Sequence, residues 1–300
     1  TAYNNFFNKR AQFPRFKSKR DTQSFRVPQG FSVGDGKIKL PKFGWVKTVM
    51  HRPIEGKPKS ITIKKTPSGR YYASILCEVD LPEPPQKSNE VGIDVGLKSF
   101  LVTSMGEIVE HPKHLRKAEK RLKRLQRRVS RRVKGSRGRE KARKALARQH
   151  EKVADKRQDF LHKLSRRLVD ENQVIYAEDL NVKGMTKNHN LAKSIGDSGW
   201  GEFFRQLAYK SEWYGTVFHQ INRFYPSSKR CHCCGFINQD LKLSDRAWTC
   251  PECGIRHSRD LNAAVNIANF GRVERTVGTT ETHTPGESGV TRSSNQEATR

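Results

Sequence analysis

The chain has 300 residues, of which 34% are hydrophobic, and its 59 lysines and arginines against 30 aspartates and glutamates give a formal net charge of +29. This length allows two or three small domains, but the low apolar content predicts modest cores. The charge indicates a polyanionic partner, and we find neither a signal-peptide pattern nor the apolar run of about 18 residues that a membrane span needs. We therefore expect a cytoplasmic protein that binds nucleic acid, with no membrane partner and no small-molecule cofactor.

Residues 1–88 are expected to form a β-rich domain. The segment opens with Tyr3, Phe6 and Phe7, which resemble the end of an apolar helix face, and Pro67-Ser68-Gly69 predicts a hairpin turn. A proline-rich linker follows at residues 81–89. The predicted strands are residues 37–40, 44–50, 60–65 and 71–79.

A second domain is expected to begin near Glu90 with a β-meander in residues 90–112. Its predicted strands are residues 91–95, 99–103 and 107–110.

Residues 113–170 contain 24 lysines and arginines against 6 acidic residues, in a segment of high helix propensity. Gly135 and Gly138 divide it into a predicted helical hairpin. A solvated charged hairpin is one interpretation, but blocks of like charge repel unless an anion neutralises them, so we favour a nucleic-acid contact. The expected contact residues lie around the turn: Arg121, Arg124, Arg128, Arg131, Arg132, Lys134, Arg137 and Arg139.

Residues 171–226 are expected to hold a buried strand at 173–177 and a helix at about 198–214. Phe203, Leu207 and Tyr214 would face the core from that helix, whereas Trp200 and Trp213 could lie on either side. Residues 270–300 have few apolar side chains, so we expect a disordered tail there.

Two Cys-x-x-Cys-Gly motifs, separated by residues 235–249, predict a zinc ribbon in residues 227–257. Two residues between cysteines let one tight turn direct both sulfurs to a single ion, and a site closed by four thiolates is structural. The predicted zinc ligands are Cys231, Cys234, Cys250 and Cys253.

Three neighbouring residues could also be considered as zinc ligands. Cys233 could replace Cys234, but only Cys234 reproduces the spacing of the second motif and its trailing glycine. His232 and His257 are expected to be solvated or to contact phosphates.

Acidic residues occur at three places where strands or helices begin or end. Asp94 lies in an apolar strand, where it needs a partner such as a metal ion unless it merely caps a turn. Glu178 and Asp179 end the buried strand, and because neighbouring side chains alternate in direction, at most one of them can share a site with Asp94. Asp260 precedes an apolar helical face in residues 258–269 and could be its N-cap or reach a cation.

The order of these carboxylates is the one expected of RNase H-like nucleases, in which they hold two Mg²⁺ or Mn²⁺ ions that cut a phosphodiester. Hard oxygen ligands suit those ions, whereas thiolates suit zinc. We therefore expect an α/β fold with an RNase H-like core that carries an inserted basic hairpin and a zinc ribbon, preceded by a β-rich domain.

Four motifs together resemble the TnpB/OrfB family of bacterial insertion sequences, and the likeness extends from about Ala2 to Ile267. They are Gly92-Ile93-Asp94-Val95-Gly96, Tyr176-Ala177-Glu178-Asp179-Leu180, Pro226-Ser227-Ser228-Lys229 and Arg259-Asp260-Leu261-Asn262-Ala263-Ala264.

This resemblance implies a transposon-encoded, RuvC-type endonuclease of bacteria or archaea that a guide RNA directs to a DNA target and that is related to type V CRISPR effectors. It implies Asp94, Glu178 and Asp260 as catalytic residues, a partial wedge-like β-barrel in residues 1–88, and RuvC segments at 90–112, 171–226 and 258–269. Members of the family begin with a further wedge strand and a helical recognition region. We therefore expect either a degenerate gene or a fragment, which would bind nucleic acid but cut a guided target poorly.

Two other functions are compatible with the residues. A cleavage-deficient nucleic-acid-binding protein of the same family would keep the basic surface, although the intact carboxylates favour an enzyme. A transposase that joins DNA ends directly also uses three carboxylates, but a ribbon between Glu178 and Asp260 fits the RuvC-type arrangement better.

Overall fold

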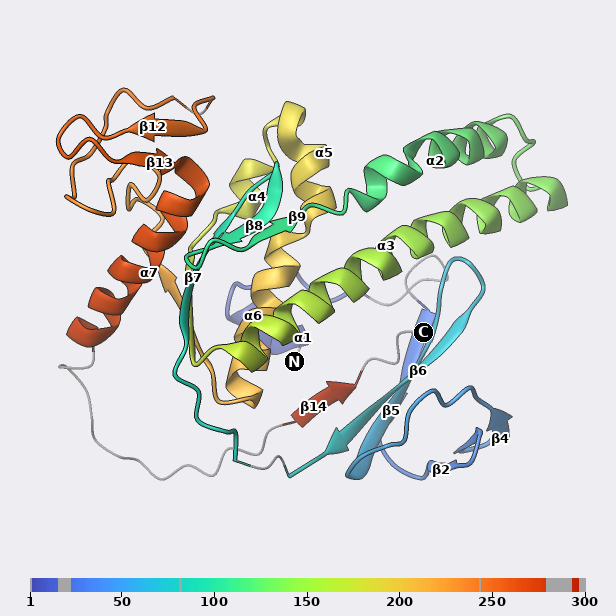
Figure 1. Ribbon diagram of the computed structural model, residues 1–300. Helices are drawn as coiled ribbons and strands as arrows, with labels where there is room; N and C mark the ends of the chain where they lie inside the picture. Colours follow the sequence, from blue (N-terminus) through green and yellow to red (C-terminus); the bar gives the residue numbers. More distant parts are fainter. Residues whose placement is uncertain (1, 16–22, 81–82, 243, 279–292, 297–300) are drawn as a thin grey trace. The chain divides into compact units, whose positions relative to one another are not determined.

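The computed structural model describes residues 2–15, 23–80, 83–242, 244–278 and 293–296 (Figure 1). The chain divides into two compact units. The first comprises Thr1–Asp80, Arg128–Arg148 and Val290–Arg300, and the second comprises Leu81–Arg127 and Gln149–Gly289. Among the described helices, none combines the length and the apolar character that crossing a bilayer requires.

The first unit contains a short helix, two antiparallel sheets and residues 128–148 of the helical hairpin described below. The four-stranded sheet has the order β1-β5-β6-β14, and the three-stranded sheet has the order β2-β3-β4. Strand β3 alternates exposed lysines with buried Ile38 and Leu40, which pack with Ile61, Ile75 and Cys77. The elements are α1 (Ala2–Phe7), β1 (Gln23–Val27), β2 (Ser32–Gly34), β3 (Lys37–Leu40), β4 (Gly44–Lys47), β5 (Lys57–Lys65), β6 (Tyr71–Glu78) and β14 (Ser293–Gln296).

The predicted hairpin in this unit is confirmed. Thr66 N donates to Arg70 O at 2.9 Å, and Gly69 takes a φ of 89°, the left-handed conformation that favours glycine. The predicted helical start is also confirmed, and Tyr3 and Phe7 are exposed in it. Strands β1 and β2 were not predicted, because neither has a clear alternation of buried and exposed positions.

The second unit is built on a five-stranded sheet of order β11-β10-β7-β8-β9. Strand β7 is parallel to β10, and β10 is parallel to β11, whereas β7, β8 and β9 form the antiparallel meander that the sequence predicts. Strand β11 was not predicted. The strands are β7 (Glu90–Val95), β8 (Ser99–Thr103), β9 (Ile108–Glu110), β10 (Val174–Glu178) and β11 (Val217–Ile221).

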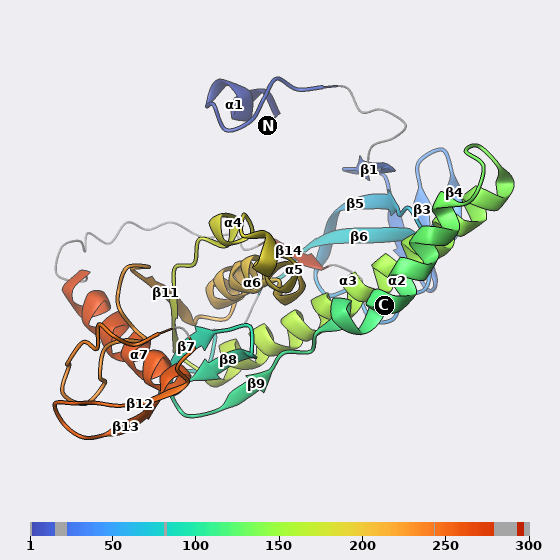
Figure 2. The same cartoon turned by 90° about the horizontal axis from the view of Figure 1, so that it is seen from above.

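Helices cover both faces of this sheet, so β10 is apolar on both sides. Ile175 and Ala177 belong to the core formed with α3 (Arg137–Glu171) and α6 (Trp200–Trp213). Val174 and Tyr176 point the other way, into the core formed with α7 (Arg259–Gly278). Figure 2 shows α7 and α6 on opposite sides of β7 and β11. Phe203 of α6 is buried, as predicted. Trp200, which the sequence could have placed on either side of the helix, is buried as well.

The basic segment forms the predicted helical hairpin, with α2 (His114–Ser130) and α3 joined around Gly135. Two short helices, α4 (Val182–Met185) and α5 (His189–Ser198), follow β10 and were not predicted. Gly199 then takes a φ of 71° and separates α5 from α6. The ribbon segment contributes β12 (Ala247–Thr249) and β13 (Arg256–Ser258).

The prediction that a disordered tail starts at residue 270 is wrong. Helix α7 continues to Gly278, because polar and aromatic contacts anchor its second half. The ring of Phe270 stacks on Tyr225 at 3.9 Å, and Arg272 and Arg275 pair with Glu90 at 2.8 Å and 3.1 Å. The prediction counted apolar residues only and so missed these ion pairs. Residues 293–296 form β14, and the other residues of the predicted tail lie outside the described part of the chain.

Candidate functional site

Asp94 and Glu178 lie at the same edge of the second unit's sheet. Strands β7 and β10 are parallel, and Ile93 is registered with Ala177, so Asp94 and Glu178 are the next positions on neighbouring strands. Side chains alternate along a strand, and Ile93 and Ala177 both face the core of α3 and α6. Asp94 and Glu178 therefore face the opposite side, which α7 covers.

Asp260 approaches that edge from α7. It is the second residue of the helix, in its first turn, so it does not hold the N-cap position considered above. The Ala264 carbonyl, one helical turn further on, lies directly over Gly92 of β7. Since Gly92 is two residues before Asp94 and on the same face, Asp260 is brought towards Asp94. Arg246 also reaches Asp260, at 3.7 Å.

We call Asp94, Glu178 and Asp260 the carboxylate cluster. Burial, with the negative charges of Asp260 and Glu178, raises the pKa of Asp94 from 3.8 to about 7. Burial, with the charge of Asp179, raises the pKa of Glu178 from 4.5 to about 7. A cation bound here would stabilise the ionised carboxylates, which is the electrostatic arrangement expected of a metal-binding edge.

Asp179 faces a different environment from Glu178. Its carboxylate pairs with the guanidinium of Arg223, which follows β11. The charge of Glu178 helps to raise the pKa of Asp94, and the charge of Asp179 helps to raise the pKa of Glu178. The sequence pattern alone left the choice between these two residues open, and the strand register now brings Glu178 towards Asp94.

The thiols of Cys231, Cys234, Cys250 and Cys253 lie together, with all four Sγ atoms within 4.8 Å of one another. Each Cys-x-x-Cys pair makes the same tight turn. Gly235 N donates to Cys231 O at 3.0 Å, and Gly254 N donates to Cys250 O at 2.9 Å. Both glycines have positive φ values, of 81° and 71°. Cys233 is exposed and is not part of this group.

The expectation that His257 is solvated or contacts phosphates is wrong. Its side chain is only 2% exposed, and Nε2 lies 3.1 Å from the Sγ atom of Cys231. The ring also packs beside Trp248, with centroids 4.8 Å apart. Strands β12 and β13 place His257 opposite Trp248, and this pairing is what buries it. His232 is half-buried, with Nδ1 3.0 Å from Oδ1 of Asn262.

Sequence reasoning missed two asparagines that attach the ribbon to α7. Asn262 Nδ2 donates to the carbonyl of Arg230 at 2.7 Å, and Asn266 Nδ2 donates to the same carbonyl at 2.6 Å and to that of Ser227 at 2.9 Å. Both asparagines are almost fully buried. The available signal in the sequence was a pair of asparagines one helical turn apart in an apolar helical segment. A polar side chain that becomes buried in such a segment needs a hydrogen-bond partner. They fix the ribbon to the helix that carries Asp260.

Seven of the eight basic side chains expected to contact nucleic acid are exposed on the helical hairpin. Arg139 differs, because its guanidinium donates to the carbonyls of Val129 and Arg132 at 3.1 Å and 2.8 Å. These bonds join the end of α2 to the start of α3. The exposed residues are Arg121, Arg124, Arg128, Arg131, Arg132, Lys134 and Arg137.

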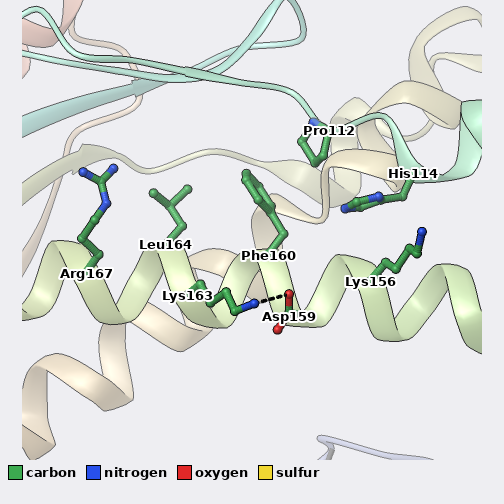
Figure 3. A pocket seen from close by; sticks show the side chains of 8 residues that line it. All are labelled: Pro112, His114, Lys156, Asp159, Phe160, Lys163, Leu164 and Arg167. Atoms are coloured by element: carbon green, nitrogen blue, oxygen red, sulfur yellow. Dashed lines mark hydrogen bonds and ion pairs between the residues drawn. The ribbon is translucent and has the colours of Figure 1, made fainter. Parts of the chain in front are cut away.

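A hollow of about 480 Å³ lies along α3 at the base of the hairpin (Figure 3). Pro112, Phe160 and Leu164 give it an apolar lining, and Lys163 on its border pairs with Asp159 at 2.8 Å. The carboxylate cluster is not among its lining residues, so the hollow is not part of the candidate catalytic edge.

Two family models match the chain. Residues 74–189 match OrfB_IS605, described as "Probable transposase", and residues 200–267 match "Cas12f1-like, TNB domain". A protein of Streptomyces pristinaespiralis named "Putative RNA-guided DNA endonuclease" is 42% identical, over 90% of this chain and 68% of that protein. The InsQ protein of Escherichia coli K12, with the same descriptive name, is 35% identical over 90% of this chain and 71% of that protein.

A solved structure shares the fold. The cryo-EM structure of a Cas12f1–sgRNA–target DNA complex matches 89% of this chain and 68% of the other chain, with a TM-score of 0.56 and 17% sequence identity. At this identity the match establishes a common mixed α/β fold.

Proposed function

The chain belongs to the TnpB/OrfB family, and from that premise we propose that it is a metal-dependent, RNA-guided DNA endonuclease with a RuvC-type site. The observation that carries this proposal is the approach of Asp94, Glu178 and Asp260 to one edge of the sheet from three separate elements. The names of the two relatives above support guide RNA and target DNA as partners. The positive charge of +29 is of the kind that a polyanionic partner neutralises.

The residues of the carboxylate cluster fit Mg²⁺ or Mn²⁺. Their donors are carboxylate oxygens, which these ions prefer, and the raised pKa values of Asp94 and Glu178 reflect burial and repulsion that a cation would offset. When bound, such ions provide an activated water and stabilise the leaving oxygen of a phosphodiester. The protein's part is to hold the three carboxylates in place: β7 and β10 fix Asp94 and Glu178, and the Gly92 contact fixes α7.

The four thiols fit a structural zinc ion. Four cysteine sulfurs leave no coordination position for a substrate, so this zinc would stabilise the ribbon and take no part in cleavage. Because Asn262 and Asn266 join the ribbon to α7, an ordered ribbon would also help to hold the helix that carries Asp260.

The domain assignment follows from the same premise. Residues 90–112, 171–226 and 258–269 would form the RuvC core, with the basic hairpin at 113–170 and the zinc ribbon at 227–257. The β-rich residues 1–88 would correspond to a wedge-like domain. In this assignment the hairpin offers its exposed arginines and lysines to nucleic acid backbones.

Guidance by RNA can be tested with the RNA that copurifies with the protein. That RNA would be sequenced, and a DNA duplex containing its complement would be incubated with the complex and Mg²⁺. We expect cleavage at the complementary duplex and none at a duplex with a scrambled sequence. Removing the RNA should abolish site-specific cleavage, and adding back the synthetic RNA should restore it. Equal cleavage of both duplexes would contradict guidance, whereas tight binding without cleavage would favour the cleavage-deficient alternative.

A further inference from the structure

An exposed aromatic ring lies on a fixed loop at the end of β11. The side chain of Phe224 is 85% exposed. The loop around it is held by several contacts: Phe224 N donates to Oδ1 of Asn222 at 2.9 Å, and the preceding Arg223 pairs with Asp179. On the other side, the ring of Tyr225 stacks on Phe270 of α7 at 3.9 Å. The exposure of Phe224 is therefore built into an anchored turn.

This loop begins beside the carboxylate cluster. Strands β10 and β11 are parallel, with Glu178 registered to Ile221, and Asp179 N donates to Ile221 O at 3.1 Å. The chain then passes directly to Arg223 and Phe224. The ion pair with Asp179 holds Arg223 next to the residue that follows Glu178.

An aromatic ring beside a fixed cation is a combination that binds single-stranded nucleic acid. Every base has a π face that can stack on an aromatic side chain, while a neighbouring arginine attracts the phosphate backbone. In a duplex the bases already stack on one another, so a ring at this position could take only an unpaired base. The large positive charge of the chain favours a nucleic acid over an apolar protein partner for this ring.

We propose that Phe224 stacks on an unpaired base next to the phosphodiester at the carboxylate cluster, while Arg223 contacts a neighbouring phosphate. This inference rests on the proposed nuclease function and adds to it the two side chains that would position the strand at the site. Stacking of one base on an aromatic ring changes binding by roughly 5-fold to 150-fold. Phe224 is thus a positioning residue that holds the strand for the carboxylates.

The first test measures contact without cleavage. The Asp94→Asn protein, with its RNA, would be irradiated with single-stranded DNA that carries 5-iododeoxyuridine, and the crosslinked peptides would be identified by mass spectrometry. We expect a crosslink at Phe224, which Phe224→Leu abolishes and Phe224→Trp retains. Phe43→Leu, which changes another exposed phenylalanine, should leave this crosslink unchanged. Crosslinks confined to other parts of the chain would overturn the proposal.

The second test measures cleavage of single-stranded DNA by the otherwise unchanged protein. Phe224→Leu should raise KM by about 5-fold to 150-fold, the range expected for one stacked base, and Phe224→Trp should restore it. Leucine keeps the apolar character but lacks a stacking face, so it separates stacking from packing. If Phe224→Leu cuts as well as the unchanged protein, the stacking role is refuted while the nuclease proposal stands. If no version cuts but the crosslink maps to Phe224, the stacking proposal stands and the nuclease proposal fails.

Discussion

Gly92 of β7 and Ala264 of α7 are in such close contact that a Cβ atom on Gly92 would lie 2.2 Å from the Ala264 carbonyl oxygen. It would also lie 2.7 Å from the Ala268 backbone nitrogen. The absence of a side chain at residue 92 therefore sets how closely α7 packs on the sheet. Because Asp94 and Asp260 lie on these two elements, the same contact sets the width of the carboxylate cluster.

Gly92→Ala should push α7 away from β7. Overpacking of this kind costs about 1–3 kcal/mol, and the displacement of Asp260 should reduce cleavage more than it reduces nucleic-acid affinity. Denaturant unfolding and single-turnover cleavage would measure the two effects. Gly196→Ala in α5 is the matched control, since a Cβ there meets nothing within 4 Å, and it should leave stability unchanged or slightly improved. A fully active Gly92→Ala protein would show that α7 does not need this close contact.

Replacing one ribbon cysteine should remove one zinc ion per chain. Cys231→Ser is expected to lose the metal and to lower the unfolding temperature, because Cys231 belongs to the four-thiol group and is buried against His257. Cys233→Ser is the control, since that thiol is exposed, and it should retain a full equivalent of zinc. Metal analysis of the purified proteins distinguishes them, and zinc loss in Cys233→Ser with retention in Cys231→Ser would reverse the ligand assignment.

Asp197 of α5 caps the start of α2. Its carboxylate accepts hydrogen bonds from Leu115 N at 2.9 Å and 3.1 Å, and Arg157 of α3 lies 3.5 Å from it. Asp197→Ala should lower the free energy of unfolding by about 1–3 kcal/mol, because it leaves a backbone donor and a guanidinium without their partner. Asp159→Ala, which removes an exposed pair with Lys163, should cost less than about 1 kcal/mol. Equal losses in the two variants would contradict the capping role.

The hairpin arginines should determine the salt dependence of binding. Replacing Arg121, Arg124 and Arg128 with glutamine is expected to weaken affinity and to reduce the slope of log affinity against log salt by about 0.7–0.9 for each lost phosphate contact. Arg139→Gln should instead destabilise the hairpin, since Arg139 donates to the carbonyls of Val129 and Arg132. Filter binding at several salt concentrations gives the slopes. An unchanged slope in the triple variant would place the nucleic-acid contact elsewhere.

The sequence predicted those features that short segments specify by themselves. The apolar run that ends at Glu178, the Pro67-Ser68-Gly69 turn and the break at Gly135 each identified an element that the structure contains. The repeated Cys-x-x-Cys spacing identified four thiols that meet. In each of these cases the pattern is local and follows from backbone preferences or side-chain periodicity.

Features that depend on partners far apart in the chain were not predicted. Asp197 lies 82 residues from Leu115, and no local pattern marks it as the cap of another helix. Similarly, Arg272 and Arg275 extend α7 by pairing with Glu90. Which of Glu178 and Asp179 points to the same side of the sheet as Asp94 depends on the register between β7 and β10. That register is known only from the folded sheet.

Single-turnover cleavage by the carboxylate variants tests the central claim most directly. The experiment compares the unchanged protein with three variants, Asp94→Asn, Glu178→Gln and Asp260→Asn, on a DNA duplex that matches the bound RNA. The control variant is Asp240→Asn, which changes an exposed aspartate. We expect the three cluster variants to lose cleavage by about two to four orders of magnitude, while their nucleic-acid affinity stays within a few fold and Asp240→Asn cuts normally. Cleavage by all three variants at the rate of the unchanged protein would contradict the assignment of the active site.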